Sequence, residues 1–310
     1  PYSSGAGVEN YAAATSMALL AFQGAGHTHF RPGQFKRTVA HGIEALLKMQ
    51  NKKGSFFDEA TGRSSHRFYT HAQATIVVCE LYGMTGDENL LEPAVAAVQY
   101  LVENQDPGRG GWRYNPRQDS DTSVTGWVVM ALQSARMAGL SVPERTFERV
   151  MDYLDLVADA DESQYAYHTG AAADAPMTAE GLLCRQYLGW PQNDERLVRG
   201  ANYLLQEKNL PAWKEPDRNV YSWYYATQVM HHMEGDFWQV WNGVMRDLIV
   251  ENQEVNGREK GSWNPTLPVA DRWGHHGGRL FVTCLSIYVL EVYYRHLPIY
   301  SNHAGRPKPG

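Results

Sequence analysis

A repeat with a period of about 50 residues limits the fold of this chain more than any other feature. In each copy an amphipathic segment ends in Gln, and a short turn then leads to an aromatic residue, as in LLKMQNKKGSF and YLVENQDPGRGGW. The four clear copies run from Gln50 to Phe56, Gln105 to Trp112, Gln206 to Trp213 and Gln253 to Trp263. The middle interval spans two periods, so a degenerate copy is predicted near residues 158–167.

Two kinds of helix alternate around these turns. The segment before each turn is apolar along one side, as in Leu91, Val95, Val98 and Val102. The segment after each turn is apolar nearly all round and is therefore expected to be buried on every side. These buried segments cover residues 9–23, 70–83, 122–138, 178–189, 221–233 and 279–296.

This alternation predicts a single all-α domain over residues 1–310, an α/α toroid of about six helical hairpins in two concentric layers. Six inner and five outer helices are expected, with residues 1–7 and 298–310 as peripheral tails. An open solenoid uses the same alternation. Closure is favoured because the repeat exceeds the usual ~34–45 residues of helical solenoids and the last helix is apolar almost to its end.

Charge and composition exclude several classes of partner. A net charge of −6 and a pI near 6.1 argue against nucleic acid and anionic membranes as partners, because no basic surface is available. No apolar stretch reaches the roughly 20 residues of a membrane span, so a soluble protein, cytoplasmic or exported, is expected.

The three cysteines lie apart in apolar segments, which is typical of buried thiols. The start at Pro1 suggests that a preceding segment was removed.

The Gln-to-aromatic motif resembles the QW repeat of squalene-hopene cyclases and of protein prenyltransferase β-subunits. The resemblance covers roughly Val8 to Tyr294. The GGWRY loop and the segment DSDTSVTGW also resemble bacterial prenyltransferase and squalene oxidase repeat proteins. The resemblance to cyclases and prenyltransferases implies a central funnel that holds an isoprenoid, with functional groups at the N-terminal ends of the inner helices.

Neither known chemistry of that superfamily matches this sequence fully. The cyclase motif Asp-x-Asp-Asp-Thr-Ala aligns with residues 118–123, which places Ser120 at the position of the general acid. The prenyltransferase zinc ligand Cys precedes a Tyr-Ser pair, and here Val220 precedes that pair. The family's His corresponds to Leu280 or Phe281. No metal or cofactor is therefore predicted.

Four residues are candidates for acid or base chemistry. Asp121 begins an inner helix; the alternative is an N-cap, which would lower its pKa. Asp119 precedes it and is otherwise a solvated loop residue. His71 occupies the same place on the second inner helix, where a structural histidine is the alternative. Glu180 lies one turn into a buried helix and needs a partner, so functional and structural roles both remain open.

A second set of residues is predicted to bind ligand in the funnel. These residues lie at or near the starts of the inner helices or in the loops before them: Tyr69, Tyr114, Thr122, Ser123, Trp127, Thr178, Tyr221, Trp223, His275 and Arg279. By contrast, Trp112 and Trp263 match the repeat position and are expected to brace neighbouring hairpins. The adjacent pair His275 and His276 is expected to point apart and not to form a metal site.

Three functions follow from these features. The main interpretation is a toroid that binds an isoprenoid-like, apolar small molecule, with cyclase-like or lyase-like acid/base chemistry at Asp121. The first alternative is a non-catalytic scaffold that binds a ligand or a protein. The second is a carbohydrate-active α/α-barrel enzyme, since aromatic platforms beside His, Tyr and Glu suit sugars. An open groove lined by Arg, Asp and Trp would favour sugar over lipid.

Overall fold

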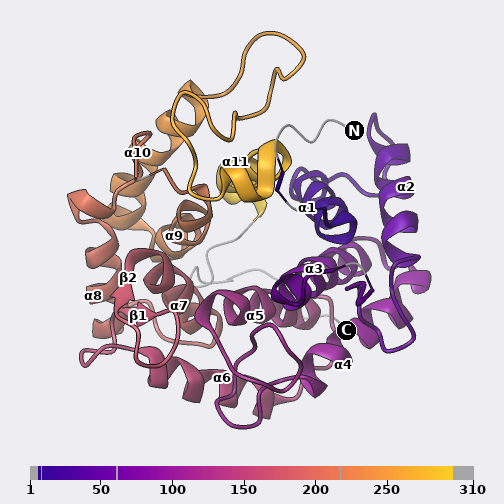
Figure 1. Cartoon of the computed structure of the whole chain (residues 1–310), viewed down its shortest axis with the longest axis horizontal. Helices are drawn as coiled ribbons and strands as arrows, with labels where there is room; N and C mark the ends of the chain where they lie inside the picture. The colour runs from indigo at the N-terminus through magenta and orange to yellow at the C-terminus, as the bar shows by residue number, and fades with distance from the viewer. Residues whose placement is uncertain (1–5, 8, 61, 217, 296–310) are drawn as a thin grey trace.

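The computed structural model describes the chain except residues 1–5, 8, 61, 217 and 296–310. Its helices form a ring in two layers (Figure 1). The inner helices are α1 (Tyr11–Gly24), α3 (Arg67–Thr85), α5 (Thr122–Met137), α7 (Ala175–Tyr187), α9 (Val220–Met233) and α11 (Gly274–Arg295). The outer helices are α2 (Lys36–Leu47), α4 (Leu91–Glu103), α6 (Glu144–Val157), α8 (Glu195–Leu204) and α10 (Gly235–Glu251).

The inner ring is closed. Each inner helix packs against the next, and α11 packs against α1, so the chain is not an open solenoid. The predicted α/α toroid is confirmed, with six inner and five outer helices among the described residues. The predicted tail 298–310 and most of the tail 1–7 lie outside the described residues.

Short elements fill the connections between helices. Three 3₁₀ turns are η1 (Ser64–His66), η2 (Glu88–Leu90) and η3 (Glu207–Asn209). The strands β1 (Tyr165–Ala166) and β2 (Ala173–Asp174) pair antiparallel at the site of the degenerate repeat copy. The three cysteines are free and buried, as their apolar surroundings predict.

The repeated Gln braces adjacent hairpins. The Gln105 side-chain amide donates to the carbonyl of Gly110 in its own turn at 2.6 Å and to that of Thr146 in the next outer helix at 2.9 Å. Gln50 bridges its own turn to α4 in the same way, and Gln253 reaches the carbonyl of Gly261. The turn glycine Gly110 has φ +93°, and a Cβ there would lie 2.1 Å from a backbone oxygen of α6, so only glycine fits.

The aromatic residue of the repeat packs beneath the same turn. Trp112 and Trp263 are both 1% exposed, and their indole N–H groups donate to backbone carbonyls of the preceding outer helices at 2.9 and 2.8 Å. The prediction that these two residues brace hairpins is confirmed. The copy at Gln206 departs from this pattern, because Trp213 stacks on the Arg218 guanidinium, 3.8 Å from the ring centroid.

The backbone amide of each repeat aromatic defines a common register for the inner helices. The amides of Phe56, Trp112, Tyr165 and Trp263 donate to side chains of the following inner helices, and the accepting residues are His71, Thr125, Thr178 and Thr283. These four residues are therefore equivalent and face the outer layer. Two residues further on, a helix has turned by about 200°, so that position faces the axis of the ring.

N-caps extend this register to the remaining helices. The side chains of Asn10, Asp121, Asp174 and Asn219 each accept a hydrogen bond from the amide three residues later. The position six residues after each cap matches the axis-facing position. We call the resulting set the axial layer; it consists of Ser16, Gln73, Trp127, Glu180, Tyr225 and Leu285.

Candidate functional site

The first turns of the inner helices meet at one end of the ring, which we call the mouth. Side-chain hydrogen bonds connect these turns. Asn10, which caps α1, donates to Thr70 of α3 at 2.7 Å. The Tyr69 hydroxyl of α3 donates to Ser123 of α5 at 2.9 Å, and Ser123 lies 2.6 Å from the Tyr221 hydroxyl of α9. The mouth is therefore a single site built from segments that are far apart in the sequence.

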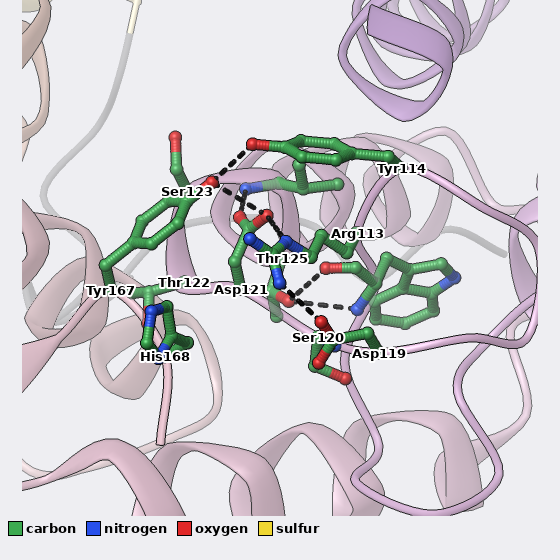
Figure 2. Close-up of polar contacts among 12 residues, drawn as sticks. Arg113, Tyr114, Asp119, Ser120, Asp121, Thr122, Ser123, Thr125, Tyr167 and His168 are labelled. Atoms are coloured by element: carbon green, nitrogen blue, oxygen red, sulfur yellow. Dashed lines mark hydrogen bonds and ion pairs between the residues drawn. The ribbon is translucent and has the colours of Figure 1, made fainter. Parts of the chain in front are cut away.

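Asp121 is the central carboxyl of the mouth. It is fully buried as the N-cap of α5, and one oxygen accepts the Val124 amide at 2.7 Å. The other oxygen accepts the Tyr167 hydroxyl at 3.1 Å and lies 3.4 Å from Nε of Arg113. The Tyr167 hydroxyl in turn lies 2.6 Å from that of Tyr114 (Figure 2).

Burial changes the acidity of Asp121. Burial raises the pKa of this carboxyl to about 7, although the Val124 amide, the Tyr167 hydroxyl and the Arg113 charge all oppose the shift. The capping hydrogen bond lowers the pKa of Asp121 as expected, but the cost of burying the charge exceeds this effect, so the net shift is upward. A carboxyl with this pKa exchanges its proton near neutral pH and can serve as an acid or a base.

Arg113 connects Asp121 to a second carboxyl. Its guanidinium forms an ion pair with Asp119, which also pairs with Arg109. The same guanidinium lies 5.0 Å from the Tyr114 ring centroid and 5.7 Å from that of Tyr167. Burial acts to raise the pKa of Asp119, but Arg113, the Ser120 amide and Arg109 outweigh it and lower that pKa. The two carboxyls beside Arg113 thus differ in acidity, because the pKa of Asp121 is raised and that of Asp119 is lowered.

The axial layer beneath the mouth is rich in polar groups. Four of its six members carry fully buried side-chain atoms without a hydrogen-bond partner in the described part of the chain: Ser16 Oγ, Gln73 Oε1, both oxygens of Glu180, and the Tyr225 hydroxyl. Unpaired buried polar atoms are costly, so their concentration at equivalent positions marks the axis as a candidate binding region.

Glu180 is the member of the axial layer whose burial costs the most free energy. It is fully buried, and a Cβ at residue 126 of α5 would lie 3.0 Å from its Oε2, so Gly126 leaves room for the carboxyl. Burial and the charge of Asp121 raise the pKa of Glu180 well above its ordinary value, while the nearby Tyr221 hydroxyl opposes this. The raised pKa favours the protonated form of Glu180, and no oppositely charged side chain among the described residues pairs with it.

Three of the predicted site residues hold the scaffold. His71 is fully buried, accepts the Phe56 amide at Nδ1 and places Nε2 3.0 Å from the Ala97 carbonyl; burial lowers its pKa to about 4. Thr178 accepts a loop amide at the equivalent position of α7. Thr122 donates to the Ala166 carbonyl at 2.6 Å. These contacts support structural roles.

The other predicted ligand-binding residues are dispersed. Trp127 is 1% exposed and packs against Tyr224 and Tyr225, and Trp223 packs against Trp213. Arg279 donates to Ser262 in the loop before α11. His275 is exposed in the first turn of α11. The predicted residues that come together at the mouth are Asp119, Asp121, Tyr114, Tyr69, Ser123 and Tyr221.

Two residues of the mouth, Arg113 and Tyr167, were not predicted from the sequence. Arg113 lies within the GGWRY loop, but no motif assigned it a role. Tyr167 lies in the degenerate repeat copy, and its hydroxyl reaches Asp121 because the residues of the β1 and β2 hairpin fold back over the start of α5. The Thr122 amide donates to the Tyr167 carbonyl at 2.9 Å and holds the hairpin there.

Among the described residues there is neither a three-residue metal cluster nor a helix that could span a membrane. No group of three or more His, Cys, Asp or Glu side chains is arranged to hold a metal ion. Within the same residues, every helix is too short or too polar to cross a bilayer.

Solved structures share this fold. The GH76A α-1,6-mannanase from Salegentibacter sp. HEL1_6 has a TM-score of 0.63 and 10% identity, covering 92% of this chain and 89% of that one. An inactive variant of the same enzyme, with two substituted aspartates, is bound to α-1,6-mannotriose (TM-score 0.61, 10% identity, 91% and 88% covered). A novel α-amylase from Clostridium perfringens has a TM-score of 0.60 and 10% identity, with 91% and 86% covered. No protein-family model and no curated protein matches the chain.

These comparisons correct the interpretation from the QW-like repeat. The similar structures are carbohydrate-active enzymes, so assignment to the terpenoid cyclase and prenyltransferase superfamily is wrong, as is the prediction of an apolar, isoprenoid-like ligand. The physical reason is that the side chains of repeat residues such as Gln105 and Trp112 hydrogen-bond to the backbone of neighbouring turns and outer helices and so brace hairpins. At 10% identity the likeness establishes the fold alone.

Proposed function

We propose that this protein is a carbohydrate-active enzyme that binds a glycan at the mouth of the ring and acts on it by acid/base chemistry at Asp121. The observation that carries the proposal is a buried carboxyl with a pKa of about 7 among Arg113, Tyr114 and Tyr167. A general acid is most effective when its pKa lies near the working pH.

Two carboxyls with different pKa values could supply the two groups that cleavage of a glycosidic bond requires. Cleavage of a glycosidic bond needs one protonated carboxyl for the leaving oxygen and one ionised carboxyl to activate water or attack the sugar. Asp121, with its raised pKa, suits the acid, and Asp119, with its lowered pKa, suits the ionised partner. Glu180 does not suit the ionised role, because its pKa is also raised.

The chemistry of the surroundings favours a hydroxylated ligand over an apolar one. The hydroxyls of Tyr114, Tyr167 and Ser123, with the guanidinium of Arg113, can exchange hydrogen bonds with sugar hydroxyls. An isoprenoid chain carries no hydrogen-bonding groups and could not exchange hydrogen bonds with these side chains. The likeness to a mannanase that binds mannotriose supports the same class of ligand.

The proposal is tested by assaying a panel of oligosaccharides, including α-1,6-mannan fragments, for binding and for release of reducing ends. Asp121→Asn is expected to bind but not cleave. Asp174→Asn is the matched control, because Asp174 caps α7 with the same geometry but is exposed. Undiminished cleavage by Asp121→Asn would remove Asp121 from the mechanism, and absence of binding to any glycan would refute the proposed class of ligand.

A non-catalytic glycan-binding protein is the second candidate. It is favoured by the use of one Asp121 oxygen in capping α5 and by the complete burial of the carboxyl. Saturable glycan binding without any cleavage by the wild-type protein would identify this function.

A further inference from the structure

Two histidines from opposite ends of the sequence face each other beside the mouth. His66 ends η1 just before α3, and His276 lies in the first turn of α11. Their Nε2 atoms are 3.2 Å apart, and their ring planes cross at 71°. The two helices flank α1 in the inner ring (Figure 1), so this contact spans the seam where the ring closes.

We propose that His66 and His276 bind a first-row transition-metal ion such as Zn²⁺ through their Nε2 atoms. Two Zn–N bonds of about 2.0–2.1 Å at a tetrahedral angle place the nitrogens ~3.3 Å apart. The observed separation of 3.2 Å therefore fits two neighbouring ligands of one ion. The ion lies off the line that joins the two nitrogens, and His276 is exposed and His66 half-buried, which leaves room for the rings to turn toward it.

The backbone holds both histidines in place. The His66 amide donates to the Arg63 carbonyl, and its carbonyl accepts the Thr70 hydroxyl, both at 2.9 Å. The His276 amide donates to the Trp273 carbonyl at 3.0 Å, and its carbonyl accepts the Gly7 amide at 3.1 Å. Because the backbone is already ordered at both positions, an ion has to fix only the side-chain torsions, which limits the entropy cost of binding.

The two histidines would fill only part of the coordination shell of the ion. The described residues provide no cluster of three ligating side chains, so water or a ligand's oxygen atoms would complete the coordination shell. Burial, and then the charges of His276 and Arg63, lower the pKa of His66, and the positive charge of Arg63 also opposes a bound cation. Imidazole nitrogen suits zinc, copper and nickel, whereas magnesium prefers oxygen. We expect moderate affinity for zinc and none for magnesium.

Calorimetric titration of the full chain with ZnCl₂ at pH 7.5 tests this site. We expect one Zn²⁺ per chain and binding weakened at least about tenfold by His66→Ala and by His276→Ala. The matched control is His275→Ala, which removes an exposed neighbouring imidazole and should leave the zinc affinity unchanged. MgCl₂ should give no binding isotherm. Thermal melts without metal verify that each variant folds.

Cobalt provides a second measurement on the unmodified protein. Co²⁺ at the site should give visible absorption bands of a nitrogen-ligated ion, and Zn²⁺ should displace it. Binding of either ion should weaken as the pH is lowered, because protons compete with the metal for the imidazole nitrogens. Absence of saturable Zn²⁺ binding to the wild-type protein, or retention of the wild-type zinc affinity by His66→Ala or His276→Ala, would overturn the proposal.

Discussion

Asp121 and Asp174 occupy the same position in successive inner helices but differ in their surroundings. Each caps its helix by accepting the amide three residues later, at 2.7 and 2.9 Å, from a similar extended backbone. Asp121 is fully buried, whereas Asp174 is exposed. The comparison shows that a local motif determines the cap, while the rest of the fold determines whether the carboxyl has an unusual acidity.

Asp121 is buried by side chains from other segments of the chain, and these side chains do not bury Asp174. Tyr167 and Arg113 contact Asp121 and separate it from water, and burial raises its pKa to about 7. Burial also raises the pKa of Asp174, opposed by the Met177 amide and the charge of Arg272. Asp121 combines a fixed position with a proton that exchanges near neutral pH.

The largest expected difference between the two aspartates is in catalysis. Asp121→Asn should lower kcat/KM for a cleaved glycan by about 10²–10⁴-fold, the usual contribution of a general acid. Asp174→Asn should stay within about twofold of the wild-type value, because its cap is preserved and its carboxyl is exposed. Initial rates of reducing-end release measure both variants. Equal losses would show that the difference in burial has no catalytic meaning.

A second difference is expected in the pH dependence of stability. Because the pKa of Asp121 is higher in the folded state, its proton stabilises the fold at low pH, and this contribution is lost as pH rises from about 4 to 7. The loss has an upper value of about 4 kcal/mol. In urea unfolding at pH 5 to 8, Asp121→Asn should flatten this decline more than Asp174→Asn. Parallel profiles for wild type and Asp121→Asn would contradict the raised pKa.

Removal of the cap itself should have a smaller effect. Asp174→Ala should reduce the free energy of unfolding by about 0.5–2 kcal/mol, since the Met177 amide loses its acceptor. Asp174→Asn retains an acceptor oxygen and serves as the control, with a change of only a few tenths of a kcal/mol expected. Chemical denaturation at pH 7 compares the two. A similar loss in both variants would mean that charge, and not capping, stabilises the start of α7.

The smallest expected effect comes from the hydroxyl that covers Asp121. Tyr167→Phe removes its hydrogen bond at a cost of about 1 kcal/mol and also removes an interaction that lowers the pKa of Asp121. The descending alkaline limb of the activity profile should therefore move to higher pH. Tyr203→Phe, which changes a half-buried tyrosine near Asp174, should leave the profile in place. A move to lower pH would contradict this arrangement.

The fold was predictable because its signals are local. Helical periodicity distinguishes one-sided from fully buried segments, and the Gln and aromatic positions recur at each turn. The structure shows why they recur: Gln105 and Trp112 bridge an outer helix, its turn and the next hairpin. These local signals also explain why the function was predicted wrongly, since residues that brace hairpins carry no information about the ligand.

The site was only partly predictable. Asp121 and its cap are visible in the sequence, but Tyr167 approaches it from 46 positions away through a degenerate copy of the repeat. His71 and Thr178 lie near helix starts in the sequence, yet they face the outer layer and accept loop amides. The pairing of His66 with His276 spans 210 positions and has no sequence signal.

The sequence by itself determined the alternating helices, the braced turns and the position of Asp121 at a helix start, because hydrogen bonds and periodicities within a few turns specify them. The tertiary structure alone decided that Asp121 is buried, that Glu180 is buried on the axis and that two distant histidines meet. Acidity and ligation depend on the distances between groups and on the water removed around them. Those quantities exist only once the ring has closed.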